Sequence, residues 1–142
     1  MVLIEGGMVS KILIAAFLGG MLGLERQVRN KPADIRTSAL VCMGAAFFGM
    51  LASLQDSSGA VLYPGVAGGI VTGLGFLGAG MIIRGREHIT GLTTAAEVWV
   101  IGAIGLSIGL GMYEIAVGTA LVVLLVQVAG KQLEKITLKR KK

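Results

Sequence analysis

Charged and hydroxyl side chains that could bind a ligand gather at a few points along an otherwise apolar chain. They flank four apolar stretches of the sequence and comprise Glu25, Arg26, Arg36, Thr37, Arg84, Thr93, Thr94 and Glu97. Carboxylates supply oxygen ligands for cations such as magnesium, whereas arginines bind phosphate or carboxylate groups through paired hydrogen bonds. If the four ends lie together, we expect these residues to form one polar pocket at the cytoplasmic edge of a membrane.

Each part of this pocket also has a purely structural explanation. Glu25 and Arg26 can form an ordinary charged helix end, with the arginine reaching toward lipid headgroups. Thr94 and Glu97 have the spacing of a capping box, in which a hydroxyl and a carboxylate satisfy free amides at a helix start. Asp34 precedes an apolar stretch, and we predict that it is an N-cap rather than a ligand.

The sequence offers little for catalysis. His88 is the only histidine and Cys42 the only cysteine, and neither stands in a pattern typical of a nucleophile with its base or of a metal site. Glu97 is the only acidic residue clearly inside an apolar stretch, which weakens the case for a pathway lined by magnesium ligands. We therefore predict a protein that is not an enzyme and needs no cofactor, and the sequence leaves a bound metal undetermined.

The segments that must position the polar residues are long and apolar. Five stretches of about 17–21 residues are long enough to cross a hydrocarbon core of roughly 30 Å as helices. They are Met8–Leu24, Ile35–Leu54, Tyr63–Ile83, Thr93–Gly111 and Tyr113–Ala129. The predicted fold is all-α, with a transmembrane domain over residues 1–130 built as a bundle of five transmembrane helices. A basic cytoplasmic tail is expected over residues 131–142.

Basic residues predict the orientation of this bundle. Twelve of the thirteen Lys and Arg residues fall in the first loop, the third loop or the tail, and only Lys11 lies on the other side. Because basic loops are retained in the cytoplasm during insertion, we predict the N-terminus outside and the C-terminus inside. The same charges suit anionic lipid headgroups better than nucleic acid, so the expected partner is the lipid bilayer and not nucleic acid.

Glycines at helical spacing predict close helix packing. Glycines four residues apart lie on one helix face and let neighbouring backbones approach. The predicted packing glycines are Gly19, Gly23, Gly69, Gly73, Gly75, Gly78, Gly80, Gly105 and Gly109. Residues 63–83 hold seven glycines, so we expect this helix either at the centre of the bundle or locally irregular.

Four segments of the chain form a recognisable series, namely Gly23–Gln27, Arg36–Val41, Gly73–Gly80 and Gly91–Trp99. Together they resemble the MgtC/SapB family of bacterial inner-membrane proteins, over nearly the whole membrane region. The resemblance implies a multi-pass inner-membrane protein linked to growth at low magnesium. In some pathogens it implies survival inside macrophages and modulation of the proton-driven ATP synthase. The likeness covers the membrane domain only, without the ACT-like C-terminal domain of many members.

Two functions fit these features. The first is a non-enzymatic modulator that binds another membrane protein through its glycine faces and senses ions or metabolites at the polar residues. The second is a transporter or channel for Mg²⁺ or another small ion, expected as a homodimer because five short helices leave little room for a pathway in one chain. We favour the first, because a magnesium pathway requires more intramembrane carboxylates than this sequence offers.

Overall fold

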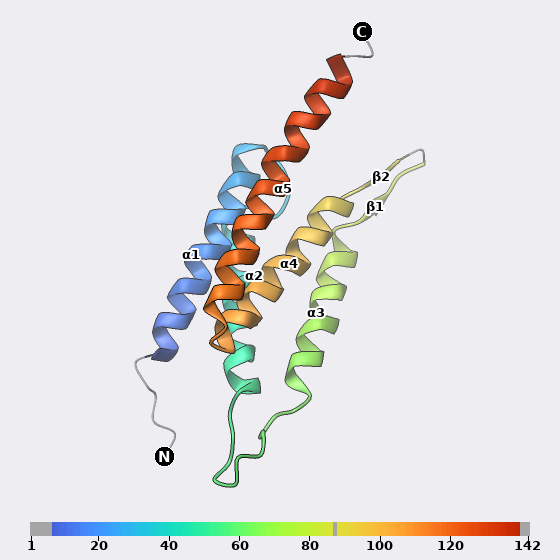
Figure 1. Cartoon of the computed structure of the whole chain (residues 1–142). Coiled ribbons are helices and arrows are strands. Elements are labelled where there is room, and N and C mark those ends of the chain that lie inside the picture. The colour runs from blue at the N-terminus through green and yellow to red at the C-terminus, as the bar shows by residue number, and fades with distance from the viewer. Residues whose placement is uncertain (1–6, 87, 140–142) are drawn as a thin grey trace.

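The computed structural model describes residues 7–86 and 88–139, which form five helices and one short β-hairpin (Figure 1). In chain order these elements are α1 (Gly7–Val28), α2 (Ile35–Ala52), α3 (Val66–Gly80), β1 (Ile83–Arg84), β2 (Ile89–Thr90), α4 (Leu92–Gly109) and α5 (Tyr113–Lys139). The helices α1, α2, α4 and α5 are each long and apolar enough to cross a membrane. The predicted membrane-spanning, helical fold is therefore confirmed.

The predicted third span, Tyr63–Ile83, is too long at both ends. The helix α3 covers only 15 residues, or about 22 Å, which is less than the hydrocarbon core of roughly 30 Å. Pro64 and Gly65 precede its first turn, and after Gly80 the chain passes into the hairpin. Six glycines inside the helix lower its helix propensity, so hydrophobicity alone overestimates its length.

The position of α3 also differs from the expectation of a central or irregular helix. It is a regular helix at the periphery, packed against α4 and α2 on one side (Figure 1). Its buried residues are only Leu74 and Gly78. The cause is the scarcity of side-chain surface on a glycine-rich helix, which gives it little apolar area to bury.

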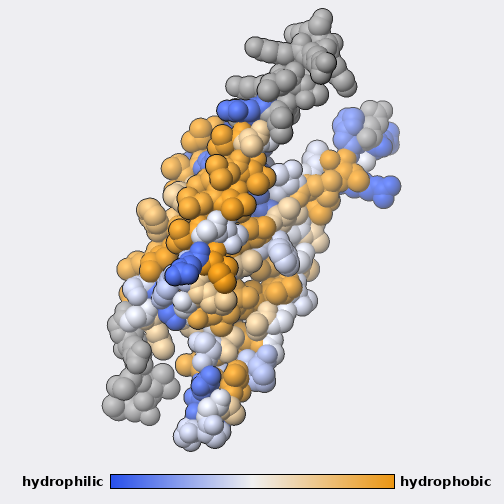
Figure 2. Space-filling view, viewed as in Figure 1, coloured by the Kyte–Doolittle hydropathy of each residue, from blue (hydrophilic) through white to orange (hydrophobic). Residues whose placement is uncertain are grey.

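The core of the bundle lies between α1, α2 and α4. Leu22 of α1, Cys42 of α2 and Ile104 of α4 are each at most 1% exposed. In the described part of the long helix α5, the small residues Ala116 and Ala120 are buried in this core, and Val123 and Leu124 pack against it partly buried. Most remaining apolar side chains face outward and cover the visible surface along the helices (Figure 2), as expected for a protein whose solvent is lipid.

The loops divide between the two ends of the bundle (Figure 1). The α1–α2 loop, the hairpin and the end of α5 lie at one end, which we call the basic end. Among the side chains that the structure describes there, the exposed or partly exposed basic ones are Arg29, Lys31, Arg36, Arg84 and Arg86. At the opposite end, Lys11 Nζ of α1 donates a hydrogen bond of 3.0 Å to the carbonyl oxygen of Gly109, where α4 ends. The helix α5 continues to Lys139 without a break at residue 130.

The start of α2 is capped by Asp34, as predicted. Its carboxylate accepts two hydrogen bonds of 3.0 Å, from the amide and from the hydroxyl of Thr37. These bonds hold the pKa of Asp34 below its usual range, with a smaller contribution from the charge of Arg36. The cap therefore prefers the ionised carboxylate.

A lowered pKa in the folded state makes this cap dependent on pH. Its stabilisation is complete above the ordinary aspartate pKa of about 4 and is lost as the pH falls through the lower pKa of the folded state. Because asparagine caps helices without a charge, we expect Asp34→Asn to melt earlier than the wild type at pH 7. The two melting temperatures, followed by circular dichroism in detergent, should converge as the pH is lowered past that range. A difference that stays constant would contradict a charged cap.

Candidate functional site

A buried ion pair joins α1 to α4 near the basic end of the bundle. Arg26 Nε lies 2.6 Å from Glu97 Oε2, and Arg26 Nη2 donates a hydrogen bond of 2.9 Å to the hydroxyl of Thr94. The side chains of Arg26 and Glu97 are only 8% and 9% exposed. Charges removed from water in this way are costly to separate, because each one needs the other for compensation.

Gln127 connects this ion pair to α5. Its Nε2 donates a hydrogen bond of 2.6 Å to Glu97 Oε1. Arg29 Nη1 donates at 3.1 Å to the backbone carbonyl of Gln127, and Arg29 Nε also pairs with Glu25, one turn earlier on α1. We call the six residues Glu25, Arg26, Arg29, Thr94, Glu97 and Gln127 the polar cluster.

The polar cluster is neutral in sum but is not fully satisfied. Its two carboxylates balance its two guanidiniums, so it is not a site of high net charge. Within the described part of the chain, Glu25 Oε2 and Gln127 Oε1 are buried acceptors with no hydrogen-bond partner. Such acceptors can receive hydrogen bonds from water or from another small donor. Among the described residues, no group of three or more His, Cys, Asp or Glu side chains is placed to hold a metal ion.

Only half of the predicted pocket comes together. The residues that meet are Glu25, Arg26, Thr94 and Glu97. The residues that do not are Arg36, Thr37, Arg84 and Thr93. Thr37 is engaged at the cap of α2, and the other three side chains are exposed. Helical phase accounts for Thr93, which lies about 100° around α4 from its buried neighbour Thr94.

The two structural alternatives were a capping box formed by Thr94 and Glu97 and an ordinary charged helix end at Glu25 and Arg26, and both are wrong. The N-cap of α4 is Gly91, at φ 87°, a left-handed conformation that favours glycine. A Cβ at Gly91 would also overlap the Met81 carbonyl oxygen. Thr94 and Glu97 bind Arg26 instead of forming a capping box. Since Arg26 is 7% exposed, it is also not a solvated arginine at a helix end.

Sequence reasoning missed Arg29 and Gln127 as members of the site. Gln127 is an amide within the apolar sequence of α5, and a polar group at that depth needs a partner. That isolated amide is the signal that could have found it. Arg29 was assigned to the first loop because the first helix was predicted to end at Leu24. The helix in fact extends to Val28, which places Arg29 one turn beyond Glu25.

The predicted packing glycines fall into two groups. A Cβ on any of the first group would contact a neighbouring helix. That group is Gly19, Gly23, Gly78, Gly105 and Gly109. A Cβ on Gly19, for example, would lie 2.6 Å from the Ser38 carbonyl oxygen of α2. The second group is Gly69, Gly73, Gly75 and Gly80 of α3, where a Cβ would meet nothing within 4 Å.

Comparison with known proteins identifies relatives over most of the chain. The sequence matches the MgtC family over residues 12–136. Protein MgtC of Salmonella typhimurium is 43% identical over 114 residues, covering 80% of this chain and 48% of that protein. YhiD of Escherichia coli strain K12, named as a proposed magnesium transporter, is 42% identical over 122 residues, covering 82% and 57%.

A third relative, SrpB of Synechococcus elongatus, is 36% identical over 142 residues, covering 92% of this chain and 78% of that protein. The chain spans about half the length of MgtC and of YhiD. No solved structure matches the chain significantly.

Proposed function

Since this chain belongs to the MgtC family, we propose that it is a non-enzymatic protein of the bacterial inner membrane that binds another membrane protein during adaptation to low magnesium. Membership of the family and the membrane-spanning helices are the premises. The binding of a partner, the inner membrane as location and the role at low magnesium are the proposal.

One observation carries the proposal, namely an uncovered stripe of small residues on the outward side of α3. The α3 stripe consists of Gly68, Thr72, Gly75 and Ala79, which follow one another at spacings of four, three and four residues and are all exposed. A Cβ on Gly68 or Gly75 would meet nothing within 4 Å. Transmembrane helices associate through such small faces, because small residues let the backbones approach closely.

The rest of the bundle supports this interpretation. Gly105 and Gly109 of α4, which share the same spacing, lie directly against the backbone of α2. In this protein a face of small residues on α4 is therefore filled by another helix, whereas the α3 stripe is not. A partner helix would bury it in the same manner.

The test is a growth assay at low magnesium in a bacterium deleted for its own MgtC-family protein. We expect the wild type and Gly118→Leu to restore growth, and Gly75→Leu to fail at equal abundance in the membrane. Gly118 is a matched control, because it is also exposed and has open space around it, but on α5. Equal growth with all three proteins would rule out the α3 stripe as the docking face.

Crosslinking identifies what covers the stripe. A cysteine at Thr72, in a Cys42→Ala background, should form a crosslink to a different membrane protein. If the cysteine crosslinks only to a second copy of this chain, the α3 stripe is the interface of a homodimer and not the docking face for a different protein.

Transport of a small ion is the second candidate, and the polar cluster is the observation that favours it. Ionisable residues within membrane-spanning helices often line ion pathways, and the name of YhiD proposes magnesium transport for that relative. Liposomes that contain a magnesium dye distinguish the two functions. Flux that is lost in Glu97→Gln would support transport, whereas sealed liposomes with folded protein and no flux would support the modulator.

A further inference from the structure

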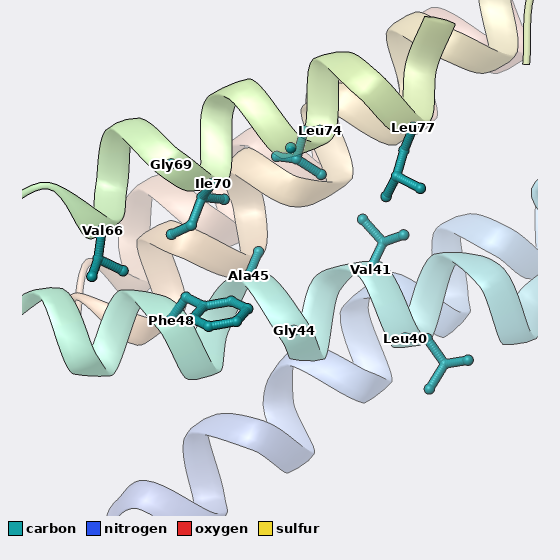
Figure 3. Close-up of a pocket in the computed structure, with 11 residues that line it drawn as sticks. Leu40, Val41, Gly44, Ala45, Phe48, Val66, Gly69, Ile70, Leu74 and Leu77 are labelled. Atoms are coloured by element: carbon teal, nitrogen blue, oxygen red, sulfur yellow. The ribbon is translucent and has the colours of Figure 1, made fainter. Parts of the chain in front are cut away.

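An apolar groove of about 600 Å³ runs between α2 and α3 (Figure 3). Phe48 and Val66 lie at one end of it, and Val41 and Leu77 face each other at the other end, nearer the basic end of the bundle. Leu40 lies at its rim and is 66% exposed. Because α3 is peripheral, the groove opens on the side of the bundle that faces lipid.

The groove exists because side chains are missing from its walls. Gly44 of α2 and Gly69 and Gly73 of α3 line it, and a Cβ at any of these positions would meet nothing within 4 Å. A space of this size left empty in a bilayer would forfeit dispersion contacts along its whole lining. Some apolar occupant is therefore favoured.

The dimensions of the groove indicate which occupant fits. Its α3 wall runs from Val66 to Leu77, a length of about 16 Å. That length is about half of the roughly 30 Å that a membrane-spanning helix needs. A hydrocarbon chain is thinner than a helix and has no polar groups to satisfy. The lining is made of Leu, Val, Ile, Phe, Ala and Gly residues and suits such a chain along its whole length.

Basic residues flank the helix segments that line the groove, on the side of the basic end. Arg36 precedes Leu40 by one helical turn and is exposed, and Arg84 follows the end of α3 and is also exposed. Among the described residues neither arginine takes part in an ion pair. The nearby Asp34 carboxylate is already bonded to Thr37. The basic end of the groove is therefore suited to an anionic group.

We propose that the α2–α3 groove binds one acyl chain of a bilayer phospholipid with an anionic headgroup, whose phosphate contacts Arg36 and Arg84. Gly44, Gly69 and Gly73 leave the volume that the acyl chain occupies. This site is separate from the α3 stripe and does not depend on the partner proposed above.

The test measures lipid binding to the purified, detergent-solubilised protein by native mass spectrometry. The probes are phosphatidylglycerol and phosphatidylcholine with identical acyl chains. Gly73→Leu fills the groove and should weaken phosphatidylglycerol binding about tenfold, because the acyl chain and the leucine compete for the same volume. Gly118→Leu on α5 is the matched control, because Gly118 is exposed, has open space around it and lies outside the groove, and it should bind as the wild type does.

Arg36→Gln tests the headgroup. It should reduce the preference for phosphatidylglycerol over phosphatidylcholine roughly fivefold, as expected for one basic residue at an anionic surface, because the choline of phosphatidylcholine offsets the charge of its phosphate. A headgroup preference identical to that of the wild type would overturn the role of Arg36.

Two results would overturn the groove as a lipid site. One is equal phosphatidylglycerol binding by Gly73→Leu and the wild type. The other is a groove filled by a second copy, in which case Gly73→Leu would convert a dimer to a monomer without changing lipid binding. If Gly73→Leu fails to fold, Gly44→Leu fills the same groove from α2, where a Cβ also has open space, and the same outcomes apply.

Discussion

Replacing Arg26 with methionine is expected to destabilise the folded protein by about 3–5 kcal/mol, the usual loss when one partner of a buried ion pair is removed. The substitution leaves the Glu97 carboxylate 9% exposed, and among the described residues its remaining donor is the Gln127 amide. Methionine retains most of the length and apolar volume of the arginine stem, so the loss reports the missing charge rather than a cavity. The measurement is the midpoint of denaturant-induced unfolding in detergent micelles.

A double substitution provides the control. Arg26→Met with Glu97→Gln removes both charges and should recover most of the lost stability, because buried pairs replaced together are often close to neutral. Arg29→Gln should cost less than Arg26→Met, since the side chains of Arg29 and Glu25 are 24% and 15% exposed. If Arg26→Met loses less than about 1 kcal/mol, this ion pair is not what holds α1 against α4.

The second large effect is expected at Gly105 of α4. A Cβ at this position would overlap the carbonyl oxygen of Cys42 and lie 3.0 Å from the Ala45 side chain. Backbone atoms cannot rotate away as a side chain can, so α2 and α4 must separate. We expect Gly105→Ala to cost about 2–3 kcal/mol, as for overpacked cores, although alanine is the better helix former. Thermal unfolding in detergent measures the loss.

Gly118→Ala is the matched control for this prediction. Gly118 lies within α5, where a Cβ would meet nothing within 4 Å. Only the difference in helix propensity then remains, and the substitution should stabilise the protein by up to about 1 kcal/mol. A similar effect of both substitutions would mean that propensity, rather than the contact between α2 and α4, decides the outcome at Gly105.

Composition and hydrophobicity were sufficient to predict the fold class and most helix positions. The predicted spans for α2 and α4 differ from the helices by at most two residues at either end. The first helix runs past its predicted end at Leu24, because Arg26 is buried against α4 and so continues the helix with charged residues. Hydrophobicity reflects composition and not contacts between helices. It therefore also overestimated the length of α3, where glycines add apolar character to the sequence but little side-chain area to bury.

The candidate site was less predictable than the fold. Arg26 and Glu97 could be identified because charges beside or within apolar stretches are conspicuous. Their direct contact, and the exclusion of Arg36 and Arg84, depend on helix phase and on the path of the hairpin, which a sequence does not specify. Gln127 was missed because a single amide leaves the sequence of α5 predominantly apolar, although its hydrogen bond to Glu97 links that helix to the other two.

The hydrogen bond from Lys11 to the Gly109 carbonyl has a mechanical consequence. Together with the Arg26–Glu97 pair it fastens α1 to α4 at both ends, so one helix cannot slide along the other without breaking both attachments. In the part of the chain that the structure describes, α3 has no side-chain hydrogen bond or ion pair to another helix. Only apolar packing, such as that of Leu74 against Gly102 of α4, then holds α3 in place, and we expect α3 to be the helix that a ligand or a partner displaces most easily.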